Sequence, residues 1–576
     1  MNIRFSTNVT HVARARSGKN EPQQYAVMSA EGDRWVCGKL IVAIGRQRPK
    51  IPRELLGHEN LLHYPDLAAT KPEDFAGQNV LIFGSGNSAF ETADALQEFS
   101  ASTHIVGRTR VRMAFQTHYV GDVRMINLLP AENYQLKLGD TVNQVHHATA
   151  MLLPLPDGKF MYFTPKAQIH FAPSPPRNVT VDELVGLVYS CYAHAHMEQD
   201  LIGPDTREWA TRVLPLLNKF YQPNPHGYVS NLFLHAAMRI PYHTVISAIG
   251  FEMETEMFEE AIRPDVQVDG FPQLTPWFEN TRANNMYFIG APAHGRDYRL
   301  SSGGFIHGFR YLVRSLHTHL EEKHHQVPWP HETIATNPNN ITRDILTRLD
   351  STSSLFQMFG YLTDVYAITC DNTISFRRYR DVPIDAIPSM QLGSDVVAFL
   401  VVYLDFHPDW RTPGAHVFAS SRSHESALFP ETSKFLHPIL KFFKGMPGEY
   451  VEAQMHNGSH YLEFHVPEDF HNRWGDKLDH LVPFFANQLY FVLPSLYPCL
   501  SHKLLRGRQP MLNQIERSKN LAASTGAVWR NETHTKAALL AEHRLFNERA
   551  PALHRINALL QARYGSLREL RAAFPK

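Results

Sequence analysis

The sequence predicts an α/β fold in which a strand–turn–helix–strand unit is inserted into a second domain. The stretch 80–96, VLIFGSGNSAFETADAL, places a buried strand, a glycine turn and a helix in direct succession, and THIVG at 103–107 supplies the second strand. Two apolar strands with the same ending, AIG at 43–45 and AIG at 248–250, stand on either side of that unit. Matching strand ends around an inserted unit favour two interleaved domains; two unrelated core strands are the alternative.

Length and composition are those of a multidomain globular protein. The chain has 576 residues, too many for one hydrophobic core, and 43% of them are hydrophobic against 19% charged. Lysine plus arginine and aspartate plus glutamate each number 56, a balance that argues against a nucleic-acid-binding stripe or a polybasic membrane patch. No apolar run approaches the roughly 20 residues that cross a bilayer. We therefore expect no nucleic-acid partner and no membrane span.

Cysteine and histidine spacing predicts no metal site and no redox-active cysteine pair. The four cysteines, Cys37, Cys191, Cys370 and Cys499, are scattered without a C-x-x-C pair. None of the 33 histidines forms H-E-x-x-H or a comparable ligand spacing. Any thiol chemistry is therefore expected to belong to a partner.

The other elements follow from hydrophobic periodicity and from proline and glycine breaks. Residues 1–45 alternate loosely, as in a β-meander, and WVCGKLIVAIG at 35–45 is expected to be one buried strand. Helices are expected over 179–200, 206–221 and 304–322, and buried strands over 244–250 and 286–290. The proline-rich stretch 327–340 is expected to be a domain linker, followed by an α+β module over 350–500 with strands at 396–408 and 460–467. From about residue 510 the sequence becomes helical.

The glycine turn carries the pattern of a dinucleotide site. In G-x-G-x-x-A between a strand and a helix, the first glycine makes the tight turn and the second lets a pyrophosphate approach the backbone. The small third residue lets helix and sheet pack closely, and the helix N-terminus faces the anion. Gly84, Gly86 and Ala89 occupy these positions. A strand-to-helix turn without a ligand is the alternative, but the flanking elements provide the context that the motif requires.

The loop after the second strand indicates which dinucleotide is bound. An NAD site usually places Asp or Glu about 20 residues after the glycines, where it binds the ribose hydroxyls. Here the strand is followed by GRTRVR at 107–112, which contains no carboxylate. Guanidinium groups suit a 2′-phosphate, so Arg108 and Arg110 favour NADPH; a solvated basic loop is the alternative.

These segments resemble the flavin-containing monooxygenase superfamily and, within it, the flavoproteins of endoplasmic-reticulum-associated degradation. GSGNSAFETA at 84–93 is similar to the superfamily's NADPH fingerprint. LIVAIGRQRPKIP and YHTVISAIGFE resemble its two interdomain connections, and MYFIG resembles its return to the flavin domain. The narrower family is resembled by THYVGDVRMIN (117–127), YQLK (134–137), DYRLSSGGFIHGFRYLVR (297–314) and FLHPILKFF (435–443). Together the matches extend over residues 1–500.

The resemblance implies an α/β flavoprotein with two dinucleotide-binding domains, FAD in one and NADPH in the other. The implied organisation is a partial FAD-binding domain over 1–78, an NADPH-binding Rossmann domain over 79–250, a return segment of the FAD domain over 251–325, an α+β accessory domain over 340–505 and a helical region over 506–576. Hydride would pass from the nicotinamide to the flavin and on to an acceptor. The implied acceptor is a disulfide-reductase partner or a protein client of the degradation pathway in the lumen of the endoplasmic reticulum.

The resemblance also implies the cofactor contacts. Gly84, Gly86, Asn87, Ser88 and Ala89 would contact the NADPH pyrophosphate, and Arg108 with Arg110 the 2′-phosphate. Gly45 and Gly250 would be hinge-strand ends, while Gly290, Asp297, Gly303 and Gly304 would line the flavin. The alternative is that the loop from 297 to 304 is only a helix entry, in which Asp297 pairs with Arg296 or Arg299. No catalytic acid or base is indicated.

Three departures from the families leave other functions open. The sequence contains no G-x-G-x-x-G for the FAD pyrophosphate, so we expect either an incomplete flavin domain or a protein that no longer holds FAD. It shows neither a secretory signal nor a retrieval tail, which makes the cytoplasm the alternative location. Leu55 and Leu61 stand where the monooxygenase signature F-x-G-x-x-x-H has its Phe and His. The leading expectation is an NADPH- and FAD-dependent oxidoreductase; the alternatives are a monooxygenase of small nitrogen or sulfur nucleophiles and a non-catalytic scaffold.

Overall fold

The computed structural model of the chain describes sixteen segments, within which all helices and strands below lie. These are residues 3–15, 23–55, 57–108, 111–117, 119–127, 151–155, 157–163, 180–182, 184–186, 205–220, 240–267, 269–334, 338–371, 373–406, 434–456 and 462–466. The helical region expected over 506–576 lies outside them, as does most of the helix expected over 179–200.

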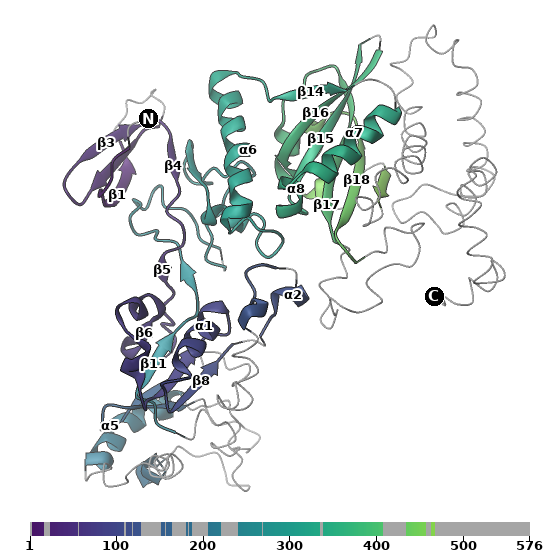
Figure 1. Cartoon of the computed structure of the whole chain (residues 1–576). Coiled ribbons are helices and arrows are strands. Elements are labelled where there is room, and N and C mark those ends of the chain that lie inside the picture. Colours follow the sequence, from purple (N-terminus) through teal and green to yellow (C-terminus); the bar gives the residue numbers. More distant parts are fainter. Residues whose placement is uncertain are drawn as a thin grey trace, which may run out of the picture.

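A four-stranded parallel sheet forms the first lobe, which lies lowest in Figure 1. Its strands follow the order β6 (Leu62–His63), β11 (Thr244–Ser247), β7 (Asn79–Phe83) and β8 (Ser102–Val106). Helix α1 (Asn87–Leu96) joins β7 to β8 and packs Ala89, Phe90 and Ala93 against the sheet. The predicted strand–turn–helix–strand unit is therefore confirmed, with β7 almost fully buried as expected for a covered parallel strand.

The chain crosses between the lobes twice, and the two crossing segments pair with each other. In the second lobe, β4 (Leu40–Val42) and β13 (Met286–Phe288) form a parallel pair. The crossing strands β5 (Arg48–Pro49) and β12 (Phe251–Glu252) are antiparallel (Figure 1). Gly45 and Gly250, just before these strands, have φ of 70° and 97°, a region that favours glycine. The first lobe is thus inserted between the two strands of the β4–β13 pair.

Two expected elements differ from the structure. The antiparallel meander of β1 (Val9–Arg14), β2 (Tyr25–Ser29) and β3 (Arg34–Cys37) is confirmed. The single strand expected over 35–45 is wrong, because the chain leaves the meander after Cys37 and enters the β4–β13 pair at Leu40. The linker expected over 327–340 is also wrong: it contains β14 (His331–Ile334), which begins directly after Pro330 and joins the edge of a large sheet.

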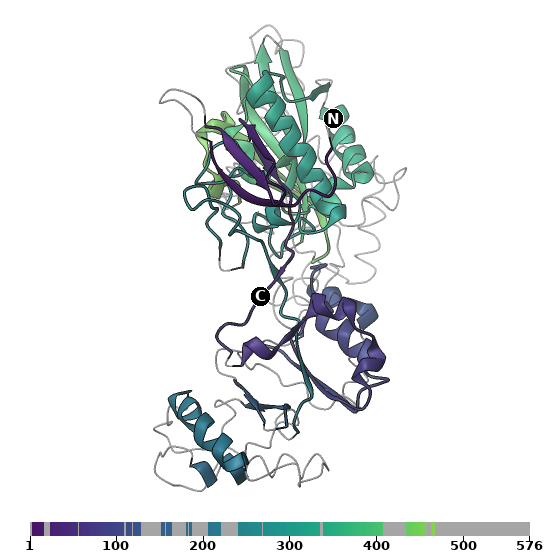
Figure 2. The ribbon, with the colours of Figure 1, turned by 90° about the vertical axis from the view of Figure 1, so that its left-hand side faces the viewer.

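That six-stranded antiparallel sheet completes the second lobe. Its order is β14, β16 (Thr373–Pro383), β15 (Leu362–Asp371), β17 (Val396–Asp405), β18 (His437–Lys444) and β19 (Leu462–His465). Helices α6 (Ile306–His325), α7 (Pro338–Ser351) and α8 (Ser354–Gln357) lie beside it (Figure 2). One hydrophobic core runs from Val12 in the meander through Phe288 and Leu312 to Leu400 in the sheet.

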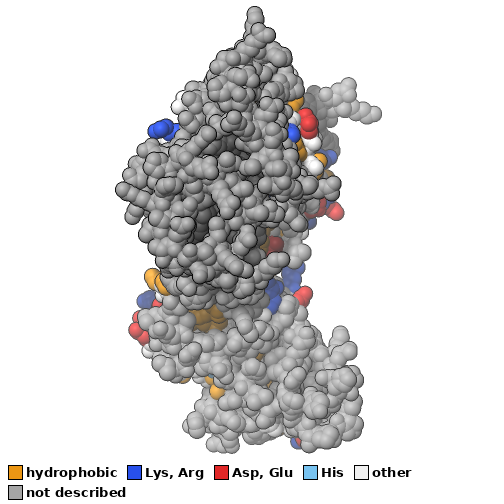
Figure 3. All heavy atoms as spheres, turned by 90° about the vertical axis from the view of Figure 1, so that its right-hand side faces the viewer, with side chains coloured by type: hydrophobic (Ala, Val, Ile, Leu, Met, Phe, Trp, Pro, Cys, Tyr) orange, Lys and Arg blue, Asp and Glu red, His pale blue; other side chains and the backbone are white. Residues whose placement is uncertain are grey.

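Smaller elements complete the described part of the chain. They are α2 (Ala114–Thr117), β9 (Met151–Pro154), β10 (Phe160–Phe163), α5 (Asp205–Phe220) and α9 (Glu452–His456). On the face drawn in Figure 3, basic and acidic side chains of the described residues are interspersed. Among the described helices, none has the length and apolar content of a membrane span.

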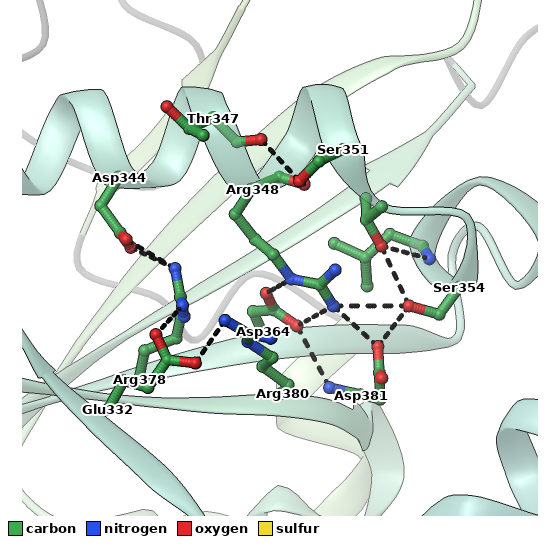
Figure 4. A network of polar contacts seen from close by, with 12 residues as sticks. Glu332, Asp344, Thr347, Arg348, Ser351, Ser354, Asp364, Arg378, Arg380 and Asp381 are labelled. Atoms are coloured by element: carbon green, nitrogen blue, oxygen red, sulfur yellow. Dashed lines mark hydrogen bonds and ion pairs between the residues drawn. The ribbon is translucent and has the colours of Figure 1, made fainter.

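A buried ion-pair network holds α7 against the large sheet (Figure 4). Nε of Arg348 donates to Oδ2 of Asp364 over 2.7 Å, and its Nη2 donates to Oδ1 of Asp381 over 2.9 Å. The Asp364 side chain is fully buried, and only 12% of the Arg348 side chain is exposed. Because burial strips water from both charges, removing one partner leaves the other uncompensated.

We expect Arg348→Ala to lower the free energy of unfolding by about 3 to 5 kcal/mol, because Asp364 would remain buried without its counter-charge. Arg380→Ala is the matched control: Arg380 and its partner Glu332 are 47% and 57% exposed. Exposed pairs contribute about 0 to 1 kcal/mol. Denaturant unfolding followed by tryptophan fluorescence measures both variants, and equal losses would contradict the assignment.

His319 on α6 lies flat on Trp277, with ring centroids 4.3 Å apart and 4° between the planes. Burial first, and then the charge of the nearby Lys323, lower the pKa of His319 from 6.5 to about 4. The folded state therefore holds the neutral imidazole.

Stability should consequently fall as the pH falls from 6.5 toward about 4, since the unfolded chain binds a proton that folded His319 does not. Above this window the group makes no pH-dependent contribution. His319→Phe keeps the stacked ring but cannot titrate, so its thermal midpoint should drop less than that of the wild type between about pH 7.5 and about pH 5. An equal drop in both proteins would show that His319 is not responsible.

Candidate functional site

The glycine turn lies at the carboxyl end of β7, between the ends of β11 and β8. Gly84 has φ 130°, and a Cβ there would come 2.3 Å from the carbonyl oxygen of Ala248, so only glycine fits. A Cβ at Gly86, the N-cap of α1, would meet no atom of the described residues within 4 Å. Open space before a helix N-terminus, whose first N–H groups have no partner within the helix, fits a phosphate. Ala89 is fully buried against the sheet, as the motif requires.

Asn87 uses its side chain to hold the bridging loop, residues 119–127. Its Nδ2 donates to the carbonyl of Asp122 over 2.9 Å. Its Oδ1 accepts from the backbone N–H of Arg124 over 2.8 Å and from Nδ2 of Asn127 over 2.9 Å. The predicted contact of Asn87 with a pyrophosphate would therefore come from its backbone. Ser88, in the same turn of helix, accepts from Oγ1 of Thr92 through its carbonyl.

Tyr119 connects the bridging loop to the junction loop, residues 290–304, through a chain of three side chains. Its Oη lies 2.9 Å from Nε2 of His294, whose Nδ1 lies 2.8 Å from Oδ1 of Asp297. Burial raises the pKa of Tyr119, so the phenol keeps its proton. The hydroxyl can then donate a hydrogen bond to Nε2 of His294. The imidazole proton is then on Nδ1, facing Asp297.

The Asp297 carboxylate is fully buried and has three donors. Besides His294, Oδ2 accepts from Oγ of Ser301 over 2.5 Å and from the N–H of Gly303 over 2.9 Å. A Cβ at Gly303 would come 2.2 Å from Oδ1 of Asp297, and one at Gly304 would come 2.8 Å from Cδ2 of His294. These glycines make room for the junction loop's own side chains. Their predicted role as flavin lining, with Asp297, stays a prediction.

The alternative pairing of Asp297 with a neighbouring arginine is wrong, because both arginines bind elsewhere. Nη2 of Arg299 lies 2.5 Å from Oδ1 and 2.8 Å from Oδ2 of Asp122 in the bridging loop. Arg296 instead pairs with Asp385 and Glu452 beside the large sheet. The junction loop is thus held by the first lobe on one side and by the antiparallel sheet on the other.

Gly290 opens the junction loop directly after β13. It has φ 77° and is the N-cap of the short 3-10 helix Ala291–Gly295. Within the part of the chain that the structure describes, a Cβ there would meet no atom within 4 Å. This backbone position at a strand end is open, so it fits the predicted approach of a flavin, whereas Gly303 and Gly304 are enclosed.

Three basic side chains, Arg46, Lys50 and Arg108, lie close enough for the charges of the first and third to act on the second. The Arg46 guanidinium lies 4.1 Å from the ring centroid of Phe271, and its Nη2 donates to the carbonyls of Phe251 and Asp269. Burial lowers the pKa of Lys50, and the charges of Arg46 and Arg108 lower it further. Arg108 is exposed just after β8, and its predicted contact with a 2′-phosphate stays a prediction. Its predicted companion, Arg110, lies outside the described residues.

Aromatic rings connect this basic group to the tyrosine–histidine–aspartate chain. Phe271 lies with its ring centroid 5.1 Å from that of Tyr298 and 5.6 Å from that of His294. Tyr119 stacks on His294 with centroids 5.8 Å apart. Sequence reasoning located the segments 117–127 and 297–314 but singled out none of Arg46, Lys50, Tyr119 or His294. Their roles come from contacts between residues far apart in the chain.

Comparison with known proteins places the chain beside flavin-dependent oxidoreductases. A family model described as L-lysine 6-monooxygenase/L-ornithine 5-monooxygenase matches residues 1–120. FAD-dependent oxidoreductase domain-containing protein 2 from Mus musculus is 28% identical over 554 residues, which cover 93% of this chain and 75% of that protein. The protein of the same name from Danio rerio is 29% identical and matches 84% of this chain and 66% of its own length. The predicted resemblance is therefore confirmed, and the chain spans about two thirds to three quarters of these relatives.

Solved structures give a weaker likeness. An FAD-bound cadaverine monooxygenase from Erwinia amylovora is 13% identical, covers 51% of this chain and 64% of its own, and has a TM-score of 0.30. A thioredoxin reductase from Lactococcus lactis is 12% identical, covers 49% of this chain and 65% of its own, and has a TM-score of 0.26.

The contact between the two loops predicts a measurable coupling between Asp122 and Arg299. A double-mutant cycle of Asp122→Ala and Arg299→Ala should give an interaction energy of about 1 to 3 kcal/mol in unfolding, because the two side chains share two short hydrogen bonds. The control is the cycle of Glu91 in α1 and Arg124 in the bridging loop, which pair with 37% and 58% of their side chains exposed. That cycle should stay below about 1 kcal/mol. Equal energies in both cycles would refute the proposed strength of the junction.

Proposed function

We propose that the chain is an NADPH- and FAD-dependent oxidoreductase that passes electrons from NADPH through flavin to an acceptor. The observation that carries the proposal is the open backbone position at Gly86, at the N-terminus of α1 on a parallel sheet, with Arg108 at the end of the next strand. A phosphate can approach this backbone, and the guanidinium suits a 2′-phosphate. The resemblance to FAD-dependent oxidoreductase domain-containing proteins supports the flavin.

Fewer residues of the chain are suited to bind FAD than to bind NADPH. Gly290 is open at the end of β13, which supports a flavin near the junction loop. The sequence has no second glycine fingerprint to hold the FAD pyrophosphate. When bound, the two cofactors would supply the hydride chemistry, while this chain would supply binding, orientation and exclusion of water.

The bridging and junction loops would position the cofactor sites relative to each other. Asn87 ties the glycine turn to the bridging loop, and Asp122 ties that loop to Arg299. The Tyr119 hydroxyl keeps its proton and donates a hydrogen bond to Nε2 of His294, and the Asp297 carboxylate fixes the imidazole. These groups are positioning residues, since their polar atoms are already used by one another.

The acceptor that we propose is a disulfide-reductase partner or a protein client in the endoplasmic reticulum, on the strength of the resemblance. Cys37 is a free cysteine whose side chain is half-buried. Burial raises the pKa of the Cys37 thiol, which disfavours the nucleophilic thiolate. Thiol chemistry is thus assigned to the partner.

A flavin-dependent monooxygenase acting on a small nitrogen or sulfur nucleophile is the second candidate. It is favoured by the match of residues 1–120 to a family described as amino-acid monooxygenases. Leu55, at the position of the signature phenylalanine, is fully buried and packs in the core of the first lobe. A non-catalytic scaffold that binds only NADPH is the third.

A visible spectrum of the purified chain after incubation with FAD distinguishes these functions. Retained flavin absorbance that NADPH bleaches in the absence of oxygen supports an oxidoreductase. Absence of retained flavin would leave only the scaffold. If flavin is retained, release of hydrogen peroxide from NADPH without any substrate would argue against a coupled monooxygenase.

Arg108→Glu should weaken NADPH binding by about tenfold or more and leave NADH binding almost unchanged, because only NADPH carries the 2′-phosphate. Arg112→Glu makes the same change of charge at an exposed position of the same loop and is the control. Titration calorimetry with both nucleotides measures the four affinities. Equal losses for NADPH and NADH in Arg108→Glu would refute the assignment of Arg108.

A further inference from the structure

We propose that Lys50, from the segment that connects the lobes, is a phosphate-binding residue that contacts the diphosphate of the dinucleotide. This inference rests on the proposed dinucleotide site and adds a residue outside the strand–turn–helix–strand unit. It would make nucleotide binding depend on the connecting segment as well as on the first lobe.

The backbone places Lys50 at the end of β11. Its N–H donates to the carbonyl of Gly250 over 2.9 Å, and Gly250 follows the last residues of that strand. The glycine turn follows β7, and Arg108 follows β8. Because β11, β7 and β8 are consecutive neighbours in one parallel sheet, Lys50 and Arg108 lie on opposite sides of Gly86. Neighbouring strands are about 4.8 Å apart, a spacing that long basic side chains can span.

Lys50 forms no ion pair within the described part of the chain, and the charges of Glu252 and Asp269 act on it only from beyond 4.0 Å. No hydrogen bond of its ammonium and no carboxylate within 4.0 Å of it is found there, although the side chain is half-buried. The nearby Glu252 already pairs with Arg48 at 3.8 Å. Burial is the main cause of the lowered pKa of Lys50, and the like charges of Arg46 and Arg108 lower it further, against the opposing effect of Glu252 and Asp269. An anion bound among the three cations would remove the repulsion between them.

Of the two cations that the connecting segment supplies, Arg46 and Lys50, the Lys50 ammonium is the one with no hydrogen bond in the described residues. Nη2 of Arg46 is used by two backbone carbonyls, and its guanidinium is stacked on Phe271. A Cβ at Gly270 would come 3.0 Å from Nη2 of Arg46 and 3.6 Å from Nζ of Lys50, so the glycine gives both side chains room. The Lys50 ammonium, in contrast, is fixed by no acceptor in the described residues and is free to bind a ligand.

The position of Lys50 favours the diphosphate over the 2′-phosphate. In this fold the diphosphate lies over the glycine turn, and the 2′-phosphate of the ribose lies near the end of the following strand. That strand is β8, which carries Arg108, whereas Lys50 is on the β11 side of the turn. Lys50 should therefore contribute equally to binding of NADH and of NADPH.

The test is titration of the full chain with NADPH, NADH and adenosine, comparing the wild type with Lys50→Gln. The dissociation constants of NADPH and NADH should both rise about tenfold with their ratio unchanged, because one charge-assisted contact to a shared phosphate is lost. Adenosine, which has no phosphate, should bind equally to both proteins. Lys50→Arg should restore both nucleotide affinities to within about threefold, which separates a charge contact from a loss of folding. Arg53→Gln removes the same charge at an exposed position three residues away and should bind as the wild type does.

The outcomes separate this inference from the proposed function. Wild-type chain that binds neither NADPH nor NADH would overturn both. Wild-type chain that binds them while Lys50→Gln binds equally well would overturn the role of Lys50 alone. A loss confined to NADPH would overturn the diphosphate assignment, since it would place Lys50 at the 2′-phosphate.

Discussion

The buried carboxylate of Asp297 is the constraint on which the junction between the lobes depends. A carboxylate removed from water is strongly unfavourable unless donors surround it, and three do so here: the His294 imidazole, the Ser301 hydroxyl and the Gly303 amide. Each donor restricts its neighbours. Gly303 must lack a side chain because a Cβ would overlap the carboxylate, and His294 must present Nε2 to Tyr119. The geometry of the junction loop thus follows from satisfying one charge.

From Tyr119 the same set of contacts reaches the glycine turn. Asp122 accepts from Arg299 through its carboxylate and from Asn87 through its carbonyl, so one residue bonds both the junction loop and the first turn of α1. The first turn of α1, next to Gly86, and the junction loop that Gly290 opens are therefore joined by direct hydrogen bonds through Asp122. Two connecting strands would otherwise be the main link between the lobes, and a two-residue antiparallel pair is a weak constraint on orientation.

Local signals in the sequence predicted the first lobe well and the junction poorly. The strand, the glycine turn and the helix over 80–96 are consecutive in the sequence, so local residue patterns are enough to predict them. The strand expected over 35–45 was misjudged because its apolar run contains the change from an antiparallel to a parallel partner, which periodicity does not record. Similarly, the prolines of 327–340 suggested a linker, but β14 begins after the last of the leading prolines and pairs with β16, a partner distant in sequence. The sequence around Arg46 and Lys50 predicts only an exit loop. Their proximity to Arg108 depends on the order of the strands in the sheet, which the sequence does not show.

Two segments of family resemblance acquire a physical meaning at this junction. Residues 117–127 and 297–314 carry no recognisable motif of acid–base or metal chemistry when taken separately. In the structure they meet, through Tyr119 with the adjoining His294 and through Asp122 with Arg299. A side chain that bonds only its own loop can be exchanged with little effect elsewhere, whereas these pairs join loops from different lobes and constrain both. The resemblance in these segments is thus best understood as the requirement for one fixed arrangement of two backbone positions, Gly86 and Gly290, each open to a ligand.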